Sequence, residues 1–195
     1  MSEGDWAAVV LAGGEGRRIG GGKPLRLLGG RTLLDRAVAQ AREASDAVAV
    51  AVRDPGQTAG VAGVERLADA AWEGPLGGLS AAFAFARARG RAAVLTLPCD
   101  MPLTPSDLAD RLAEALGSQG AALAASGGRL HPVCGLWRVE ALGALSAYAA
   151  TGRRSLKGFA AEVGFTAVDW PVEPLDPFFN VNTPEDLARA EALLG

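Results

Sequence analysis

The sequence predicts an α/β protein in which a mostly parallel, Rossmann-like sheet carries helices on both faces. Short apolar runs alternate with helical patterns along the chain, which is the order expected of a three-layer α/β/α domain. The run Ala47–Val52 contains no polar residue, so this strand is expected to be buried on both faces. The 195 residues are 49% apolar and 21% charged, which suits one globular domain covering residues 1–195.

Apolar runs and helix-start signals place the elements of the first part of the chain. Thr32 and Asp35 have the spacing of a capping box, and Leu34, Val38 and Ala41 share one face of the helix that follows. The expected elements are a strand at 6–11, a helix at 32–44, strands at 47–52 and 61–67, a helix at 79–89 and a strand at 92–97.

The second part of the chain contains two clear helix starts and one hairpin signal. Thr104 and Thr183 are each followed by a proline, which predicts a threonine cap with proline in the first helical position. The pair Gly127-Gly128 between apolar runs predicts a hairpin. The expected elements are a helix at 104–116, strands at 121–126 and 130–137, helices at 139–149 and 155–163, a strand at 165–170 and a last helix from 183.

The stretch Leu11–Lys23 directly follows the first strand and surrounds Arg17, Arg18 and Lys23 with glycines. Glycine lets the backbone approach a ligand and point successive N–H groups toward it, and arginine and lysine bind polyanions. The expected ligand is a nucleotide triphosphate. The alternative is a glycine-rich surface turn with solvated arginines.

Two familiar glycine motifs do not fit this stretch. A dinucleotide fingerprint that begins at Gly14 would need glycine where Ile19 stands. A P-loop that ends at Lys23 would need glycine in place of Arg17 and a hydroxyl residue in place of Pro24. The stretch is therefore a basic glycine loop of a third kind.

Two acidic residues follow predicted strands at the same edge of the sheet. Ligands of open α/β sheets bind beyond the carboxyl ends of the strands, so Asp69 and Asp100 are expected to meet the glycine loop. An acid at the end of a buried strand needs a cation, and Mg²⁺ binds one or two carboxylates together with phosphate oxygens and water. The alternatives are that Asp100 caps a turn or pairs with an arginine, and that Asp69 is a solvated turn residue.

Several segments resemble those of the molybdenum cofactor guanylyltransferases. They are Leu11–Lys23 (L-A-G-G-x-x-x-R-M-G-x-x-K), Gly74–Gly78 (G-P-L-x-G), Pro98–Pro102 (P-C-D-x-P) and Asn180–Leu187 (N-V-N-T-P-E-D-L). The sequence departs from the pattern at Ile19, where the family has Met, and at Gly22, where the family often has Asp and one more residue in the loop. The resemblance extends from Leu11 to Leu187 and implies a fold of the nucleotide-diphospho-sugar transferase type.

The resemblance also implies a role for particular residues. The implied nucleotide site consists of Leu11, Ala12, Gly13, Gly14, Lys23, Asp69, Gly77 and Asp100. The implied catalytic residues are Lys23, Arg18 and Asp100, with Asp100 as the Mg²⁺ ligand. Asn180, Asn182 and His131 are expected to contact the second substrate.

Some of these residues have a second interpretation from the sequence. Asn182 is placed equally well as the residue before a helix cap, and a lone histidine in a strand, such as His131, is usually structural. Arg153, Arg154 and Lys157 either bind the phosphate of the second substrate or form a solvated face.

The activity implied by the resemblance is transfer of GMP from GTP to the phosphate of molybdopterin (Mo-molybdopterin), which forms the guanine dinucleotide cofactor and pyrophosphate. The implied partners are GTP, molybdopterin, molybdenum-insertion proteins and acceptor enzymes. Alternatives are a cytidylyltransferase for the same cofactor, a sugar- or polyol-phosphate transferase, or a non-catalytic nucleotide-binding partner.

Composition excludes several other classes of protein. A net charge of −3 provides no basic field for nucleic acid. Cys99 and Cys134 have no metal-ligand spacing and are expected to be reduced thiols. Because Glu3 and Asp5 stand where a signal peptide would be basic and no apolar run is long enough to span a membrane, we expect a cytoplasmic protein.

Overall fold

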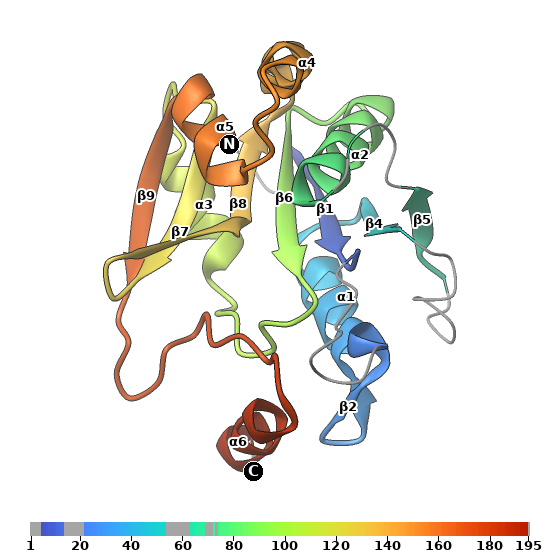
Figure 1. The fold of residues 1–195 in the computed structure, drawn as a ribbon, viewed down its shortest axis with the longest axis vertical. Coiled ribbons are helices and arrows are strands. Elements are labelled where there is room, and N and C mark those ends of the chain that lie inside the picture. The colour runs from blue at the N-terminus through green and yellow to red at the C-terminus, as the bar shows by residue number, and fades with distance from the viewer. Residues whose placement is uncertain (1–4, 14–21, 54–62, 69–71, 73, 195) are drawn as a thin grey trace.

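A seven-stranded sheet forms the centre of the computed structural model, which describes residues 5–13, 22–53, 63–68, 72 and 74–194 (Figure 1). The strand order is β5-β4-β1-β6-β8-β7-β9. The strands are β1 (Trp6–Leu11), β4 (Val48–Val52), β5 (Glu65–Ala68), β6 (Ala93–Pro98), β7 (Ala121–Ser126), β8 (Arg129–Arg138) and β9 (Phe165–Trp170). Strand β8 runs antiparallel to its neighbours β6 and β7, and the other pairings are parallel, so the predicted mostly parallel sheet is confirmed.

Helices cover both faces of the sheet, as predicted. The helices are α1 (Leu33–Ala44), α2 (Pro75–Ala88), α3 (Leu108–Ala115), α4 (Leu142–Ala150), α5 (Leu156–Val163) and α6 (Pro184–Leu194). Side chains of a strand alternate between faces, so Ala8 and Val10 pack in the core under α1 and α3, whereas Ala7 and Val9 pack under α2, α4 and α5. No helix in the described ranges is long and apolar enough to cross a bilayer.

The carboxyl ends of β1 and β6 point toward the small β2–β3 hairpin and α6 (Figure 1). Strands β2 (Leu27–Leu28) and β3 (Arg31–Thr32) follow a short 3₁₀ turn, η2 (Lys23–Leu25). Leu28, Leu33, Val181 and Ala190 form a separate small apolar cluster. This cluster fixes the last helix against the hairpin at the edge of the sheet where a ligand is expected.

Some helix starts agree with the sequence and others do not. The capping box of α1 is confirmed, because the Thr32 hydroxyl accepts the Asp35 N–H at 2.9 Å. The predicted helix start at Thr104 is wrong: its hydroxyl donates to the Met101 carbonyl at 2.7 Å, and α3 begins only at Leu108. Helix α2 begins at Pro75 rather than at residue 79, so the G-P-L-x-G segment forms its first turn.

The predicted β7–β8 hairpin is present and its turn consists of Gly127 and Gly128. Their φ values of 52° and 76° are those of a two-residue turn that favours glycine at both positions. The pairing register shifts between Leu123, opposite Gly135, and Ala124, opposite His131. The shift bulges β8 next to the edge where the parallel strands end.

A 3₁₀ turn, η4 (Val139–Ala141), joins β8 to α4. Strand β5 is shorter than predicted and begins at Glu65, and residues 61 and 62 lie outside the described ranges.

Candidate active site

Lys23 lies at the centre of a polar cluster at the carboxyl edge of the sheet. Its Nζ is 2.6 Å from Asp100 Oδ2 and 2.7 Å from Asn182 Oδ1, and Asn180 Oδ1 is 3.4 Å away. Only 7% of Lys23 is exposed, so these oxygens replace water around the ammonium group. Gly22 precedes Lys23 with a φ of 59°, a left-handed conformation that suits glycine, and the shortened loop still brings the lysine to Asp100.

Asp100 is positioned by the end of β6 and by two neighbouring segments. Its backbone carbonyl accepts the Val181 N–H at 2.8 Å, which brings the segment before α6 beside the end of β6. On α1, the Gln40 amide donates to the Thr104 carbonyl at 2.8 Å and to that of Pro105 at 3.4 Å. The loop that follows Asp100 is therefore fixed to a helix of the core.

Asn182 is oriented by the start of α6. The carboxylate of Asp186 accepts the N–H groups of Asn182 and Thr183 at 2.9 and 3.0 Å, and the Thr183 hydroxyl accepts the Asp186 N–H at 3.1 Å. This reciprocal pattern is a capping box. Asn182 therefore precedes the helix cap, and its side chain also contacts Lys23; its contact with the second substrate stays a prediction.

His131 contacts a different set of residues. Its Nε2 lies 2.8 Å from the Ser126 hydroxyl, and its ring stacks on Phe178 at 4.7 Å. The side chain is buried, and this burial lowers the pKa of His131 from its ordinary value of 6.5, so the ring is neutral at physiological pH. Its partners Ser126 and Phe178 are not among the residues that contact Lys23, and the sequence interpretation of a structural histidine fits these contacts.

The remaining predicted site residues fall into three groups. Leu11, Ala12 and Gly13 lie at the end of β1, and Gly77 is buried in the first turn of α2. Gly14, Arg18 and Asp69 lie outside the described residues, so their predicted roles stay predictions.

The basic residues between α4 and α5 contact the protein itself. Arg153 pairs with Glu162 at 3.2 Å and covers the ring of Tyr148, and Arg154 donates to the Ala149 carbonyl. Lys157 is exposed. These contacts favour the solvated-face interpretation over a phosphate clamp.

The donor chemistry of the cluster fits a hard divalent cation. Asp100 supplies carboxylate oxygens and Asn180 and Asn182 supply amide oxygens, which are the ligand types that Mg²⁺ accepts beside water and phosphate. Within the described ranges, no group of three or more His, Cys, Asp or Glu side chains could form an all-protein metal cage. An Mg²⁺ here would therefore depend on phosphate oxygens for the rest of its coordination.

The cysteines have no part in this cluster. Cys99 and Cys134 are unpaired and buried. Burial raises the pKa of Cys99 to about 12 and also raises that of Cys134, so both are protonated thiols, as the sequence predicted.

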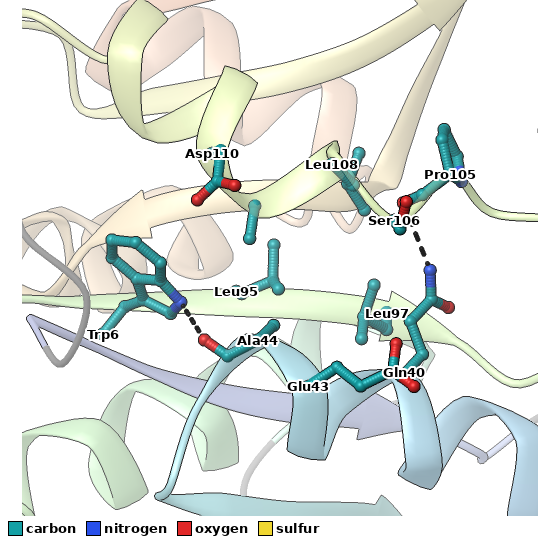
Figure 2. Close-up of a pocket in the computed structure, with 11 residues that line it drawn as sticks. Trp6, Gln40, Glu43, Ala44, Leu95, Leu97, Pro105, Ser106, Leu108 and Asp110 are labelled. Atoms are coloured by element: carbon teal, nitrogen blue, oxygen red, sulfur yellow. Dashed lines mark hydrogen bonds between the residues drawn. The ribbon is translucent and has the colours of Figure 1, made fainter.

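A cavity of about 160 Å³ between α1 and α3 is a separate feature (Figure 2). Leu95 and Leu97 of β6 form its floor, and Trp6 closes one end, where its indole N–H donates to the Ala44 carbonyl at 2.9 Å. None of its lining residues belongs to the predicted site. The cavity is therefore distinct from the polar cluster around Lys23.

The sequence also matches a known domain family. A family model described as MobA-like NTP transferase domain matches residues 8–164. The chain belongs to this family. The family resemblance drawn from the sequence is thereby confirmed.

Relatives of this MobA-like domain share its full length. A protein named molybdenum cofactor guanylyltransferase from Cereibacter sphaeroides is 43% identical over 188 residues, 95% of each chain. One of the same name from Acidiphilium cryptum is 45% identical over 190 residues, 95% of this chain and 93% of that protein.

Solved structures show the same fold. Molybdopterin-guanine dinucleotide biosynthesis protein A from Archaeoglobus fulgidus superposes with a TM-score of 0.75 at 25% identity, covering 96% of this chain and 98% of the other. A 2-C-methyl-D-erythritol 4-phosphate cytidylyltransferase from Thermus thermophilus has a TM-score of 0.72 at 22% identity, over 96% and 97% of the chains, and shows the fold alone. The predicted fold of the nucleotide-diphospho-sugar transferase type is confirmed.

Sequence reasoning missed Asp186, Ser126 and Asp176. Asp186 stands three residues after Thr183, so the capping-box spacing in the sequence was a usable signal. The contact of Ser126 with Asp176 joins residues that are 50 positions apart in the chain, and no local pattern predicts it.

Proposed function

We propose that the protein transfers GMP from GTP to the terminal phosphate of molybdopterin, forming the guanine dinucleotide cofactor and pyrophosphate. The observation that carries this proposal is the convergence of Lys23, Asp100 and Asn182 at the edge of the sheet where the glycine loop begins. The names of the full-length relatives support the choice of GTP and molybdopterin. Proteins that insert molybdenum and enzymes that accept the cofactor are the proposed protein partners, and the cytoplasm is the proposed compartment.

The reaction requires alignment and charge neutralisation more than proton transfer. An oxygen of the molybdopterin phosphate forms a bond to the α-phosphorus of GTP, and the bond between that phosphorus and the β-phosphate oxygen breaks. A phosphate monoester has a second pKa of about 6 and is largely ionised at neutral pH, so no general base is needed. The neutral, buried ring of His131 is in keeping with such a mechanism.

Each residue of the cluster around Lys23 would contribute either to alignment of the substrates or to charge neutralisation. Asp100 would hold Mg²⁺, which when bound neutralises charge on the phosphates. Lys23 would then exchange the Asp100 and Asn182 oxygens for phosphate oxygens of GTP. The backbone N–H of Gly13, at the end of β1, would face the same phosphates, and Asn180 and Asn182 would orient the acceptor.

Pyrophosphate release with molybdopterin present tests the proposal, with GTP, CTP, ATP and UTP compared at equal concentration. We expect GTP to be preferred and release to require both molybdopterin and Mg²⁺. Preference for CTP would instead favour a cytidylyltransferase for the same cofactor. Tight GTP binding without pyrophosphate release would favour a non-catalytic nucleotide-binding partner.

A further inference from the structure

The hydroxyl of Ser126, at the end of β7, lies between His131 and Asp176. Its Oγ is 2.8 Å from His131 Nε2 and 2.9 Å from Asp176 Oδ1. A serine has one hydroxyl proton and a carboxylate only accepts, so Ser126 donates to Asp176 and accepts from His131. The neutral ring of His131 therefore carries its proton on Nε2.

Phe178 contacts both His131 and Asp176, the two partners of Ser126. Asp176 Oδ1 also accepts the N–H of Phe178 at 2.9 Å, and the Phe178 ring stacks on His131 with an interplanar angle of 22°. Trp170 of β9 meets Phe178 edge-on at 5.4 Å. Ser126 and Phe178 are 1% and 2% exposed, so water does not compete for these contacts.

From Phe178 the chain continues directly into the active site. Val181 donates to the Asp100 carbonyl, and Asn182 contacts Lys23 and is capped by Asp186. Segment 176–182 is thus fixed at one end by the hairpin and at the other by the site.

We propose that His131 is a positioning residue: through Ser126 and Asp176 it fixes the segment that presents Asn180 and Asn182 to the acceptor phosphate. The inference rests on the proposed function for the identity of the acceptor. His131 acts on the segment and not on the reacting atoms, because the residue is 7% exposed and its Nε2–H is donated to Ser126. Displacement of the two asparagines weakens alignment of the acceptor, which is the part of catalysis most sensitive to small shifts.

The proton assignment is tested first, by nitrogen NMR of the free protein. His131 is the only histidine of the chain, so labelling histidine with ¹⁵N gives one pair of ring signals without further assignment. We expect the wild-type ring to be neutral with its proton on Nε2, and Ser126→Ala to shift both ring signals. A ring protonated on Nδ1 in the wild-type protein would overturn the proposal, whether or not the protein transfers GMP.

Kinetics of variants test the consequence for the acceptor. Ser126→Ala should raise KM for molybdopterin about tenfold while the dissociation constant of GTP changes less than about twofold. His131→Gln, which retains an amide N–H near the position of Nε2, should be closer to wild type than His131→Leu. Thr96→Val is the matched control, because Thr96 is fully buried and accepts the Trp137 N–H at 3.1 Å within the sheet.

The comparison with Thr96→Val separates positioning from general loss of stability. Equal effects of Ser126→Ala and Thr96→Val on KM for molybdopterin would overturn the proposal, and so would equal activity of His131→Gln and His131→Leu. If the wild-type protein transfers no GMP, the proposed function fails, and the ring signals still decide the contact between His131 and Ser126.

Discussion

Replacement of Lys23 by Met removes the ammonium group from the centre of the site while keeping most of the aliphatic chain. Asp100 then loses its ion pair at 2.6 Å and Asn182 loses a hydrogen bond at 2.7 Å. Hydrogen bonds to charged groups contribute about 1.5–3 kcal/mol each when buried. The side chain of Asp100 is 23% exposed, and water reaching it offsets part of this loss.

We therefore expect Lys23→Met to lower the free energy of unfolding by about 2 kcal/mol, which lowers Tm by about 4–8 °C for a domain of this size. The oxygens released by the lysine should then bind a divalent cation without nucleotide. Mg²⁺ should raise the Tm of the variant by more than that of the wild-type protein, and GMP transfer should fall about 100-fold or more because a phosphate contact is lost.

Thermal unfolding with and without Mg²⁺ measures both effects in one assay. Lys157→Met is the matched control, since Lys157 is the other lysine of the chain and is exposed on α5. The reasoning is refuted if Lys23→Met and Lys157→Met have the same Tm, or if Mg²⁺ stabilises the wild-type protein as much as Lys23→Met.

Other residues give further expected outcomes. Asp100→Asn keeps the size of the side chain but removes its charge, so pyrophosphate release should fall about 100-fold or more while the fold persists by circular dichroism. Asp186→Ala leaves the N–H groups of Asn182 and Thr183 without their acceptor, so urea unfolding should show a loss of about 1–2 kcal/mol. Folding lowers the pKa of His131 and therefore favours the neutral ring. The contribution of the neutral ring to the free energy of unfolding is complete above the unfolded pKa of about 6.5, and it is lost as the pH falls through the pKa of the folded state. Urea unfolding of His131→Gln should accordingly lose less stability than wild type between about pH 7 and about pH 5.

Each of these outcomes can fail separately. Normal Mg²⁺-dependent turnover of Asp100→Asn would remove Asp100 from the reaction. An unchanged midpoint in urea for Asp186→Ala would mean that water replaces the cap. Parallel pH profiles of wild type and His131→Gln would show that protonation of His131 is not linked to folding.

The fold could be predicted closely because burial leaves a clear pattern in this sequence. The run Ala47–Val52 lacks polar residues because β4 lies between β1 and β5 and is covered on both faces. Gly127 and Gly128 predicted the hairpin correctly, because its turn requires positive φ at both positions and glycine adopts positive φ readily. At such positions one local requirement, either burial or backbone conformation, determines which residue types occur.

Helix starts were less predictable, because several residues compete to begin a helix. Thr104 and Pro105 have the residue types of a cap and a first helical position, yet the Thr104 hydroxyl binds the Met101 carbonyl and Gln40 binds the backbone carbonyls of both residues. These contacts come from the tertiary structure and hold the segment in a turn. Pro75 begins α2 because Gly74 adopts a φ of 77° and supplies the change of direction.

The site was predictable where residues sit at strand ends and unpredictable where it depends on distant contacts. Asp100 follows β6 directly, and topology alone brings it to the edge of the sheet where the glycine loop begins. Lys23 contacts Asn182 as well as Asp100. Lys23 and Asn182 are 159 residues apart in the sequence, and they meet only because the last part of the chain returns to this edge of the sheet. No local signal encodes such a contact.

The antiparallel direction of β8 changes which residues lie at the edge of the sheet where a substrate is expected. Two parallel strands are joined by a crossover connection. Both strands therefore contribute the same kind of end, carboxyl or amino, to a given edge of the sheet. The β7–β8 hairpin returns through Gly127 and Gly128 alone, and it therefore delivers the last residue of β7 and the first residues of β8 to a single place. Substitutions in this turn would change the residues at that place and leave β1 and β6, which end beside Lys23 and Asp100, untouched.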